Sequence, residues 1–409
     1  MEILTTSWVL PVEAPPLRRG RVAIDDGRVA WVGQAGDAGE PEGSLRDLGP
    51  GILLPGLVNA HCHLELSHLS GRVPFGDGFT GWVEALVAAR AAGSAPVSTV
   101  PAAPGKGDEA QAAAEAAILS LEACGTVAVG DVSNTLGHID RLAASGLSGV
   151  VFLELLAWDP AKAEATLAWA EERRSDAARS LRPGLDVRLA AHAPHSVSPA
   201  LLRLLVERGG PAAIHLAESP DETAFLESGG GEWPGFLARR GLGHVAFEPP
   251  RKSPVRYAES LGVLHGGLVA AHGVQVDGAD RQRLARRGVH VVVCPRSNRN
   301  LRVGTADVPA LLAAGVPLAL GTDSLASAET LDVLDDAVLL HRQFPGLDPG
   351  AILRMATLGG ARALGLDDLG AIVPGKRAAL AFALAPGAER EPHEFLLSGE
   401  ARLEPVAAR

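Results

Sequence analysis

Two histidines separated by one residue, His61 and His63, follow an apolar run that ends at Pro55. On an extended strand successive side chains point to opposite faces, so these two imidazoles share one face. A strand that ends at the mouth of a site would aim both rings at one point. A divalent ion there would bind ring nitrogens at about 2.0–2.1 Å. Such a pair indicates a metal site only when further candidate ligands lie elsewhere in the chain.

The partners are three residues that each end a separate apolar run: His215, His272 and Asp323. Nitrogen and oxygen ligands without a thiolate suit Zn²⁺, Fe²⁺ or Mn²⁺. A bound divalent ion lowers the pKa of its water toward about 7, so that hydroxide forms near neutral pH. The sequence therefore predicts a metal-dependent hydrolase that adds water to a C=N or C=O carbon.

Three side chains, those of Asp323, Glu218 and His272, can move or hold a proton in that reaction. Asp323 can take a proton from the water while it also touches the ion. Glu218, three residues after His215, can carry a proton between the water, a ring nitrogen and the leaving group. His272 can orient the hydroxide or polarise the electrophile. We therefore predict catalytic roles for all three.

The elements that must position these residues alternate along the chain between about 52 and 365. The apolar runs that predict strands are 52–60, 125–132, 149–156, 186–192, 211–217, 267–273, 289–294 and 317–322. The stretches that predict helices include 79–92, 109–124, 160–180, 199–208 and 330–342. Strands that alternate with helices favour a parallel sheet, and this number of them suggests a closed (β/α)8 barrel. Barrel enzymes carry their chemistry at the carboxyl ends of the strands, where the predicted site residues lie.

The two ends of the chain have a different rhythm, with short strands and turns. Asp25-Asp26-Gly27 is a typical hairpin turn between two such strands. We expect residues 1–51 and 366–409 to form one small β-domain, and 52–365 to form the barrel. Residues 91–107, rich in Ala, Pro, Gly and Ser, are expected to form a mobile loop near the mouth.

Composition excludes several classes of partner. The 409 residues are 47% hydrophobic and carry a formal net charge of −11, without a basic stripe that would bind a nucleic-acid polymer. The N-terminus lacks the features of a signal peptide, and no apolar run is long enough to span a membrane. The 3 cysteines form no metal-type or disulfide pattern. We expect a soluble cytoplasmic enzyme with a small-molecule substrate, one that binds neither nucleic acid nor membrane.

At these residues the chain resembles the amidohydrolase superfamily. The resemblance spans nearly the whole chain and is carried by Pro55–Leu66, His192–Ser198, His215–Glu222, His272–Asp277, Cys294–Asn298, Gly321–Ser324 and Gly370–Lys376. It implies a distorted (β/α)8 barrel with a composite β-sandwich from both termini. It also implies that His61, His63, His215 and Asp323 hold one divalent ion, with Zn favoured over Fe or Mn. Glu218 and His272 fall on the proton-shuttle and water-orienting positions, and relatives of this kind often form homodimers.

The positions of the lysines indicate whether the site holds one metal ion or two. Members of this superfamily with two metals bridge them through a carboxylated lysine or a glutamate in the middle of the barrel. The only lysines are Lys106, Lys162, Lys252 and Lys376, and none lies on a predicted strand. Glu154 is a conceivable bridge, but it precedes the end of its strand. We therefore expect a mononuclear site, as in the deaminase and chlorohydrolase branch.

The substrate is indicated by further resemblances. The His63–Ser67 stretch is similar to that of deaminases acting on 6-aminodeoxyfutalosine in menaquinone biosynthesis, an adenosine extended at C5′ by a carboxyphenyl ketone. We predict that Glu65 holds ribose hydroxyls and that His192 and Trp82 contact the substrate. Arg72, Arg90 and Arg296 are candidates to pair the remote carboxylate.

Other functions stay open at this stage. The base could belong to guanine, adenosylhomocysteine or a pterin-like compound, or the reaction could open a cyclic amide or act on a triazine. The chain could also be a silent relative that only binds a ligand. A binder would not need the proton-transfer set of Glu218, His272 and Asp323, so we favour the enzyme.

Overall fold

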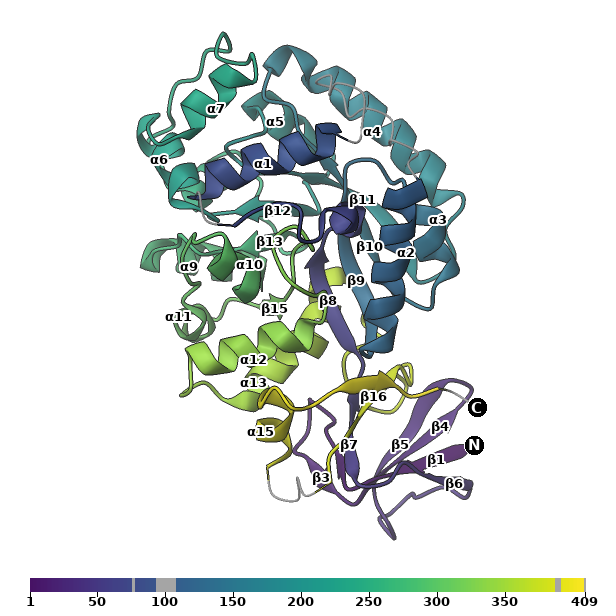
Figure 1. Ribbon diagram of the computed structural model, residues 1–409. Helices are drawn as coiled ribbons and strands as arrows, with labels where there is room; N and C mark the ends of the chain where they lie inside the picture. The colour runs from purple at the N-terminus through teal and green to yellow at the C-terminus, as the bar shows by residue number, and fades with distance from the viewer. Residues whose placement is uncertain (76–77, 93–107, 387–390, 408–409) are drawn as a thin grey trace.

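The computed structural model describes residues 1–75, 78–92, 108–386 and 391–407, and the loop expected over 91–107 falls largely outside them. A barrel surrounded by helices stands on a smaller β-domain that contains both termini (Figure 1). This arrangement confirms the predicted fold class. The boundaries predicted for the two domains, 1–51 with 366–409 and 52–365, stay a prediction.

The small β-domain consists of two sheets. One has the order β5-β4-β1-β6, and the other has the order β17-β16-β7-β2-β3. Their strands are β1 Glu2–Thr5, β2 Trp8–Val9, β3 Leu17–Arg18, β4 Gly20–Asp25, β5 Arg28–Gln34, β6 Ser44–Asp47, β7 Gly51–Pro55, β16 Leu380–Leu384 and β17 Leu403–Pro405. Strands β4 and β5 pair antiparallel around Asp25–Arg28, as the hairpin turn predicts. Because β16 pairs with β7, both ends of the chain build the second sheet.

The barrel consists of two parallel four-stranded sheets, in the orders β11-β10-β9-β8 and β12-β13-β14-β15. Their strands are β8 Leu57–Cys62, β9 Thr126–Ser133, β10 Ser148–Leu155, β11 Leu185–Ala191, β12 Ala213–Leu216, β13 Val269–His272, β14 His290–Val293 and β15 Leu318–Leu320. The predicted run 52–60 is two strands, because the chain leaves the small β-domain at Pro55 and enters the barrel at Leu57.

Backbone hydrogen bonds join the two sheets on both sides. Between β11 and β12, His215 N–H donates to His192 O at 2.7 Å. On the other side, the N–H groups of Thr322 and Asp323 both donate to His61 O at 3.0 Å, and Asn59 Nδ2 donates to Thr322 Oγ1 at 2.8 Å. These bonds close the barrel and place a predicted ligand of β8 beside one that follows β15.

Helices cover the outside of the barrel (Figure 1). The helices are α1 Gly78–Ala92, α2 Asp108–Ala123, α3 Ile139–Ala144, α4 Ala163–Ala178, α5 Pro199–Glu207, α6 Pro220–Ser228, α7 Trp233–Arg239, α8 Pro254–Ser260, α9 Gly278–Arg287, α10 Pro295–Asn300, α11 Val308–Ala313, α12 Val333–Gln343, α13 Pro349–Arg354, α14 Gly360–Leu364 and α15 Pro392–Leu397. Short turns are Leu64–Leu69, Pro160–Lys162 and the π-helical Met355–Gly359.

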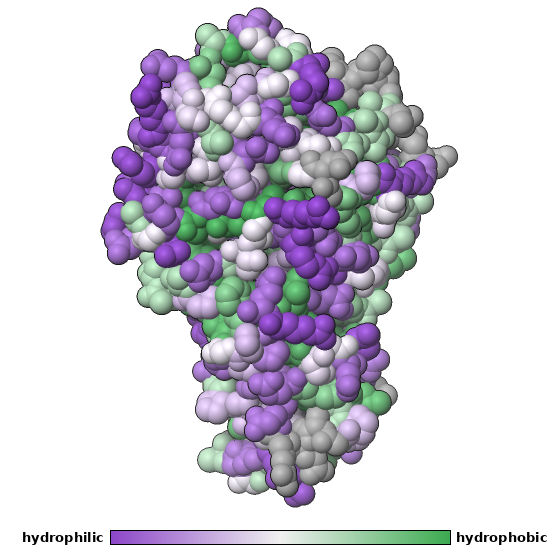
Figure 2. Space-filling view, turned by 60° about the vertical axis from the view of Figure 1, so that its left-hand side comes forward, coloured by the Kyte–Doolittle hydropathy of each residue, from purple (hydrophilic) through white to green (hydrophobic). Residues whose placement is uncertain are grey.

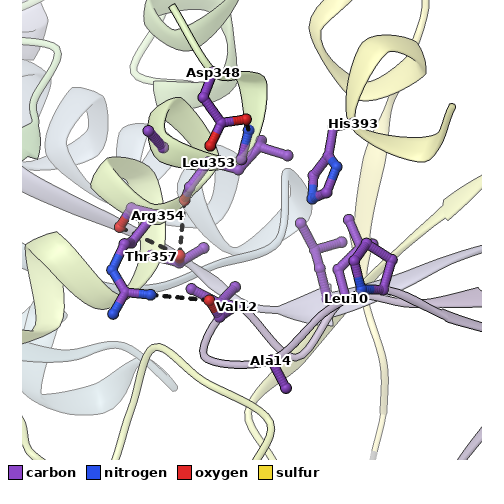
Figure 3. Close-up of a pocket in the computed structure, with 12 residues that line it drawn as sticks. Leu10, Val12, Ala14, Asp348, Leu353, Arg354, Thr357 and His393 are labelled. Atoms are coloured by element: carbon purple, nitrogen blue, oxygen red, sulfur yellow. Dashed lines mark hydrogen bonds between the residues drawn. The ribbon is translucent and has the colours of Figure 1, made fainter.

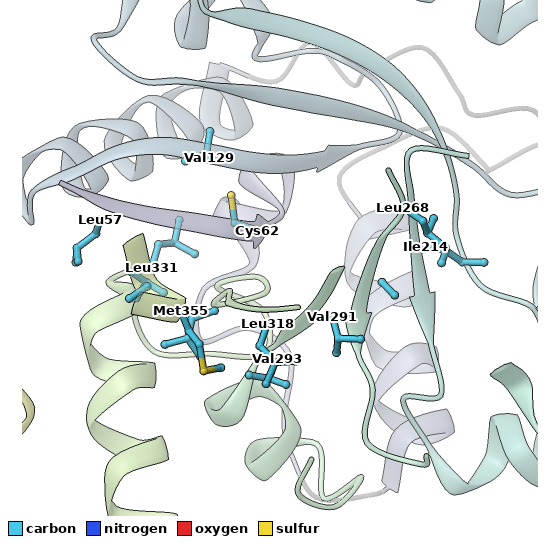
Figure 4. Close-up of a cluster of buried hydrophobic side chains, with 14 of the residues drawn as sticks. Leu57, Cys62, Val129, Ile214, Leu268, Val291, Val293, Leu318, Leu331 and Met355 are labelled. Atoms are coloured by element: carbon cyan, nitrogen blue, oxygen red, sulfur yellow. The ribbon is translucent and has the colours of Figure 1, made fainter. Parts of the chain in front are cut away.

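The core lies between the strands and these helices. Figure 4 shows Val129, Ile214 and Val291 on three different barrel strands, and Met355 close to Leu331 and to Leu318 of β15. Inside the barrel, Val58, Phe152 and Val292 belong to a second buried cluster. Burial of a side chain of this size contributes about 1.5–3 kcal/mol to folding. These two layers hold the strand ends that carry the site.

Figure 2 shows hydrophilic side chains over most of one face, with smaller hydrophobic groups between them. A pocket of about 320 Å³ lies where the small β-domain meets α13, with Leu10, Leu54, Arg354 and His393 in its wall (Figure 3). It lies toward the amino end of β8, away from His61. No helix in the described ranges is long and apolar enough to cross a membrane.

Gly321 allows the close approach of β15 to β8. A Cβ at this position would lie 2.8 Å from both Cβ and O of His61. We expect Gly321→Ala to destabilise the protein by about 1–3 kcal/mol, because the barrel would have to open to accept the methyl group. Urea unfolding measures this. Gly346→Ala is the matched control, since Gly346 has open space around it, and an equal loss in both variants would contradict the argument.

Candidate active site

The four predicted metal ligands converge at the carboxyl ends of β8, β12 and β15. His63 Nε2 lies 3.4 Å from Asp323 Oδ1, and His61 Nε2 lies 3.9 Å from the same oxygen. His215 Nε2 lies 3.3 Å from His63 Nε2. Their side chains are at most 11% exposed. The ring nitrogens and the carboxylate oxygen therefore surround one small volume.

This set suits a metal ion. His61 Nε2 is buried and has no hydrogen-bond partner among the described residues. Such a nitrogen is costly to bury unless something binds it. His215 Nδ1 lies 3.0 Å from His192 O, so it carries the hydrogen and leaves the Nε2 lone pair free. Three imidazoles and one carboxylate match the ligands that Zn²⁺ takes in proteins.

Local backbone strain accompanies the site. His272, Asp323 and Ala217 all have positive φ angles, of 76°, 62° and 54°. Residues other than glycine rarely adopt this conformation, and it costs about 1–3 kcal/mol at each position. All three follow or end barrel strands at the mouth. The strain turns the chain sharply where a side chain must face the site.

Two side chains hold the Asp323 carboxylate in place. Its Oδ2 accepts hydrogen bonds from Ser297 Oγ at 2.6 Å and from Ser327 Oγ at 2.9 Å. Its Oδ1 therefore remains to face the histidines. Burial raises the pKa of Asp323, but the neighbouring His63, His272 and His61 outweigh burial and bring the pKa down to about 2. Asp323 is an anion at neutral pH.

Glu218 and His272 form a second pair beside the four ligands. Glu218 Oε1 lies 3.5 Å from His272 Nε2. Asn298 Oδ1 lies 2.9 Å from His272 Nδ1, which fixes the ring. Burial raises the pKa of Glu218 to about 7, although His272 acts in the opposite direction. A carboxyl group that titrates near neutral pH suits proton transfer.

The chain places Glu218 by starting a helix directly after it. Ser219 caps α6 by accepting from Glu222 N–H, and Pro220 takes the first helical position. Both residue types are favoured there. Glu222 in turn accepts the N–H of Glu218 at 2.8 Å through its own Oε2. The backbone of Glu218 is therefore fixed immediately before the helix.

The predicted substrate residues lie around the same mouth. His192 directly follows β11, with its ring centre 5.0 Å from that of His215, and its Nδ1 lies 2.5 Å from Ser196 Oγ. The Trp82 ring is buried on α1, where Nε1 donates to Ala326 O at 3.2 Å. Glu65 has an 8% exposed side chain. Its Oε2 accepts from Ser133 Oγ, Thr135 Oγ1 and two backbone N–H groups.

Sequence reasoning missed several residues that support the site. Ser327, Asn134 and Glu222 carry no motif of their own that would have identified them. Ser297 and Asn298 lie in Cys294–Asn298, a segment that carries the resemblance, but their contacts with Asp323 and His272 needed the structure. Each acts by holding a predicted residue.

The chain matches the family model described as Amidohydrolase family over residues 52–395. It is 37% identical over 326 residues to an aminodeoxyfutalosine deaminase of Deinococcus radiodurans, covering 77% of this chain and 73% of the relative. It is 31% identical over 379 residues to a 5-methylthioadenosine/S-adenosylhomocysteine deaminase of Nitratidesulfovibrio vulgaris, covering 87% and 77%. The zinc-bound adenosine deaminase structure from Xanthomonas campestris superposes with a TM-score of 0.77 at 26% identity, covering 98% and 89%.

The raised pKa of Glu218 predicts a pH-dependent cost to stability. A carboxyl whose folded pKa is about 7 penalises the folded state once it must ionise, mainly between pH 5 and 7. We expect Glu218→Gln to stabilise metal-free protein by up to about 3 kcal/mol at pH 8 and by little at pH 4.5. Denaturant unfolding at both pH values measures this. The exposed Glu400→Gln is the control, and an equal effect of Glu218→Gln at both pH values would contradict the assignment.

Proposed function

Because the chain belongs to the amidohydrolase family and is a hydrolytic deaminase, we propose that it replaces the 6-amino group of an adenine-type nucleoside with oxygen. The observation that carries this proposal is the Glu218–His272 pair set 3.5 Å apart beside four convergent metal-type ligands. Water enters and ammonia leaves, so the reaction needs one nucleophile and a route for two protons. The site offers groups for both.

We assign the metal to His61, His63, His215 and Asp323. When bound, a divalent ion such as Zn²⁺ acts as a Lewis acid and makes a nucleophile available at neutral pH. Asp323 is the base for the attacking water, since it is anionic and held by two serine hydroxyls. Glu218 gives its own proton to the ring nitrogen, then takes the remaining proton of the added hydroxyl and gives it to the leaving amino group, which departs as ammonia. The proton that Asp323 took from the water finally restores the acid form of Glu218. His272 polarises the carbon that is attacked.

For the substrate we propose 6-aminodeoxyfutalosine, and hence a role in menaquinone biosynthesis. The Deinococcus relative and the His63–Ser67 stretch support this choice. The second candidate is 5-methylthioadenosine or S-adenosylhomocysteine, which the Nitratidesulfovibrio relative supports. These compounds share the adenosine part and differ at C5′. The side chains that meet the C5′ extension must therefore decide between them.

His192 is our proposed contact for the base or ribose, because it lies beside His215 at the end of β11. Direct contacts of Glu65 and Trp82 with the substrate stay predictions. The Glu65 carboxylate already accepts hydrogen bonds on both oxygens, and the Trp82 N–H already has an acceptor. Both side chains would shape the mouth even without touching the substrate.

The structure distinguishes the three arginines considered for a substrate carboxylate. Arg296 is buried and bonded to Asp336 and Thr330. Arg72 is exposed and pairs with Glu109. Arg90 has a 34% exposed side chain and lies at the mouth, where it donates to Glu65 and Asn134. We therefore propose that Arg90 recognises the anionic end.

We expect metal-replete protein to convert 6-aminodeoxyfutalosine in an ultraviolet assay of the adenine-to-hypoxanthine change. Removing the metal with a chelator should abolish turnover, and adding Zn²⁺ should restore it.

Asp323→Asn should lower kcat by about 10²–10⁴-fold, since the base is lost. Adenosine, 5-methylthioadenosine and S-adenosylhomocysteine serve as comparison substrates. No turnover of any aminopurine nucleoside by replete protein would refute the proposed function.

Arg90→Gln should raise KM for the carboxylate substrate by about 10–100-fold, the usual value of a charged hydrogen bond. KM for the matching carboxamide should change much less, because it offers no negative charge. Arg72→Gln is the control for loss of a positive charge outside the site. An equal loss for both substrates would show that Arg90 only supports Glu65.

A further inference from the structure

One buried carboxylate beside the site has no part in the proposed reaction. Glu154 lies near the end of β10 and is 3% exposed. Its Oε1 has no hydrogen-bond partner that meets normal geometry among the described residues. A buried acid of this kind costs stability, so its presence calls for a function.

The unpartnered oxygen of Glu154 faces the back of His215. Glu154 Oε1 lies 3.4 Å from His215 Nδ1, while His215 Nε2 faces His63 on the opposite side of the ring. His215 Nδ1 also lies 3.0 Å from His192 O. The N–H of His215 thus lies between a backbone carbonyl and a carboxylate, and its other nitrogen faces the proposed metal position.

We propose that Glu154 is a positioning residue for His215. Its carboxylate strengthens metal binding by attracting the Nδ1–H of that ring. A carboxylate behind a metal-binding histidine fixes the orientation of the ring and makes the ligating nitrogen more basic. This inference rests on the proposed metal site. It adds a residue that touches neither the substrate nor the metal.

A neighbouring asparagine sets which oxygen of Glu154 faces His215. Asn134 Nδ2 donates to Glu154 Oε2 at 2.8 Å and to Glu154 O at 3.2 Å. Asn134 Oδ1 in turn accepts from Arg90 Nη1 at 3.2 Å, which fixes the direction of the amide. Oε2 is therefore occupied, and only Oε1 remains for the ligand.

This arrangement makes glutamine at position 154 a sharp probe. In Glu154→Gln the amide oxygen must accept from Asn134 Nδ2, so the new NH₂ group would face His215 Nδ1–H. Two hydrogen-bond donors would then face each other, while the volume of the side chain at position 154 would be nearly unchanged. Exchanging the partners, with Asn134→Asp and Glu154→Gln together, would turn the amide so that its oxygen faces His215 again.

The experiment measures Zn²⁺ affinity by competition with a coloured chelator. We expect Glu154→Gln to bind about 10–100-fold more weakly than the wild type, and the exchanged double variant to recover part of the loss. Glu154→Asp, which shortens the side chain and keeps its charge, should also bind more weakly. Asp280→Asn is the matched control, a buried carboxylate on α9 that should leave Zn²⁺ affinity unchanged.

Each outcome decides one question. Unchanged affinity in Glu154→Gln and Glu154→Asp overturns the positioning role, whereas a wild type that binds no ion overturns the proposed metal site instead. Glu154, His192 and His215 also lie close enough to hold an ion themselves. Two ions per wild-type chain, with one lost in Glu154→Gln, would replace the positioning role by a second metal site. Thermal unfolding of the metal-free variants checks that each is folded.

Discussion

The seam between β8 and β15 is the constraint on which the site depends. His61 O accepts two backbone N–H groups there, from Thr322 and Asp323. The side chain of Asn59 bonds Thr322 both as donor and as acceptor. Without this closure the two histidines at the end of β8 and the carboxylate that follows β15 would lie on separate edges. A metal-type site assembled from distant segments therefore comes from the same bonds that close the barrel.

Burial then gives two carboxyl groups opposite roles within one site. Asp323 is surrounded by imidazoles and serine hydroxyls, so its pKa falls to about 2. Glu218 has fewer compensating contacts, so desolvation dominates and its pKa rises to about 7. Environments that push two carboxyl pKa values apart let one group start as an anion that can accept a proton and the other start as an acid that can give one. The strained φ angles at Ala217 and Asp323 aim both groups at the mouth.

The parts that the sequence predicted are those governed by local rules. The period-2 placement of His61 and His63 and the alternation of apolar runs with helical stretches depend on short-range geometry. The division at Gly56 was missed because an apolar run does not reveal that two sheets share it. The roles of Ser327 and Asn134 depend on contacts between segments far apart in the chain. Glu65 was predicted to bind a sugar, but whether it has a hydrogen bond to spare could be judged only from its neighbours.

Helix α1 connects substrate recognition to the rest of the mouth. Trp82 bonds the segment after β15 through Ala326, Thr80 bonds Asp221 at the start of α6, and Arg90 bonds Asn134 after β9. One helix thus fixes three sides of the opening while its own side chains do not ligate the proposed ion. Changes on α1 could alter the shape and charge of the mouth and leave His61, His63 and Asp323 in place. Relatives that share the deaminase chemistry can therefore differ in the nucleoside they accept, because separate elements carry the two tasks.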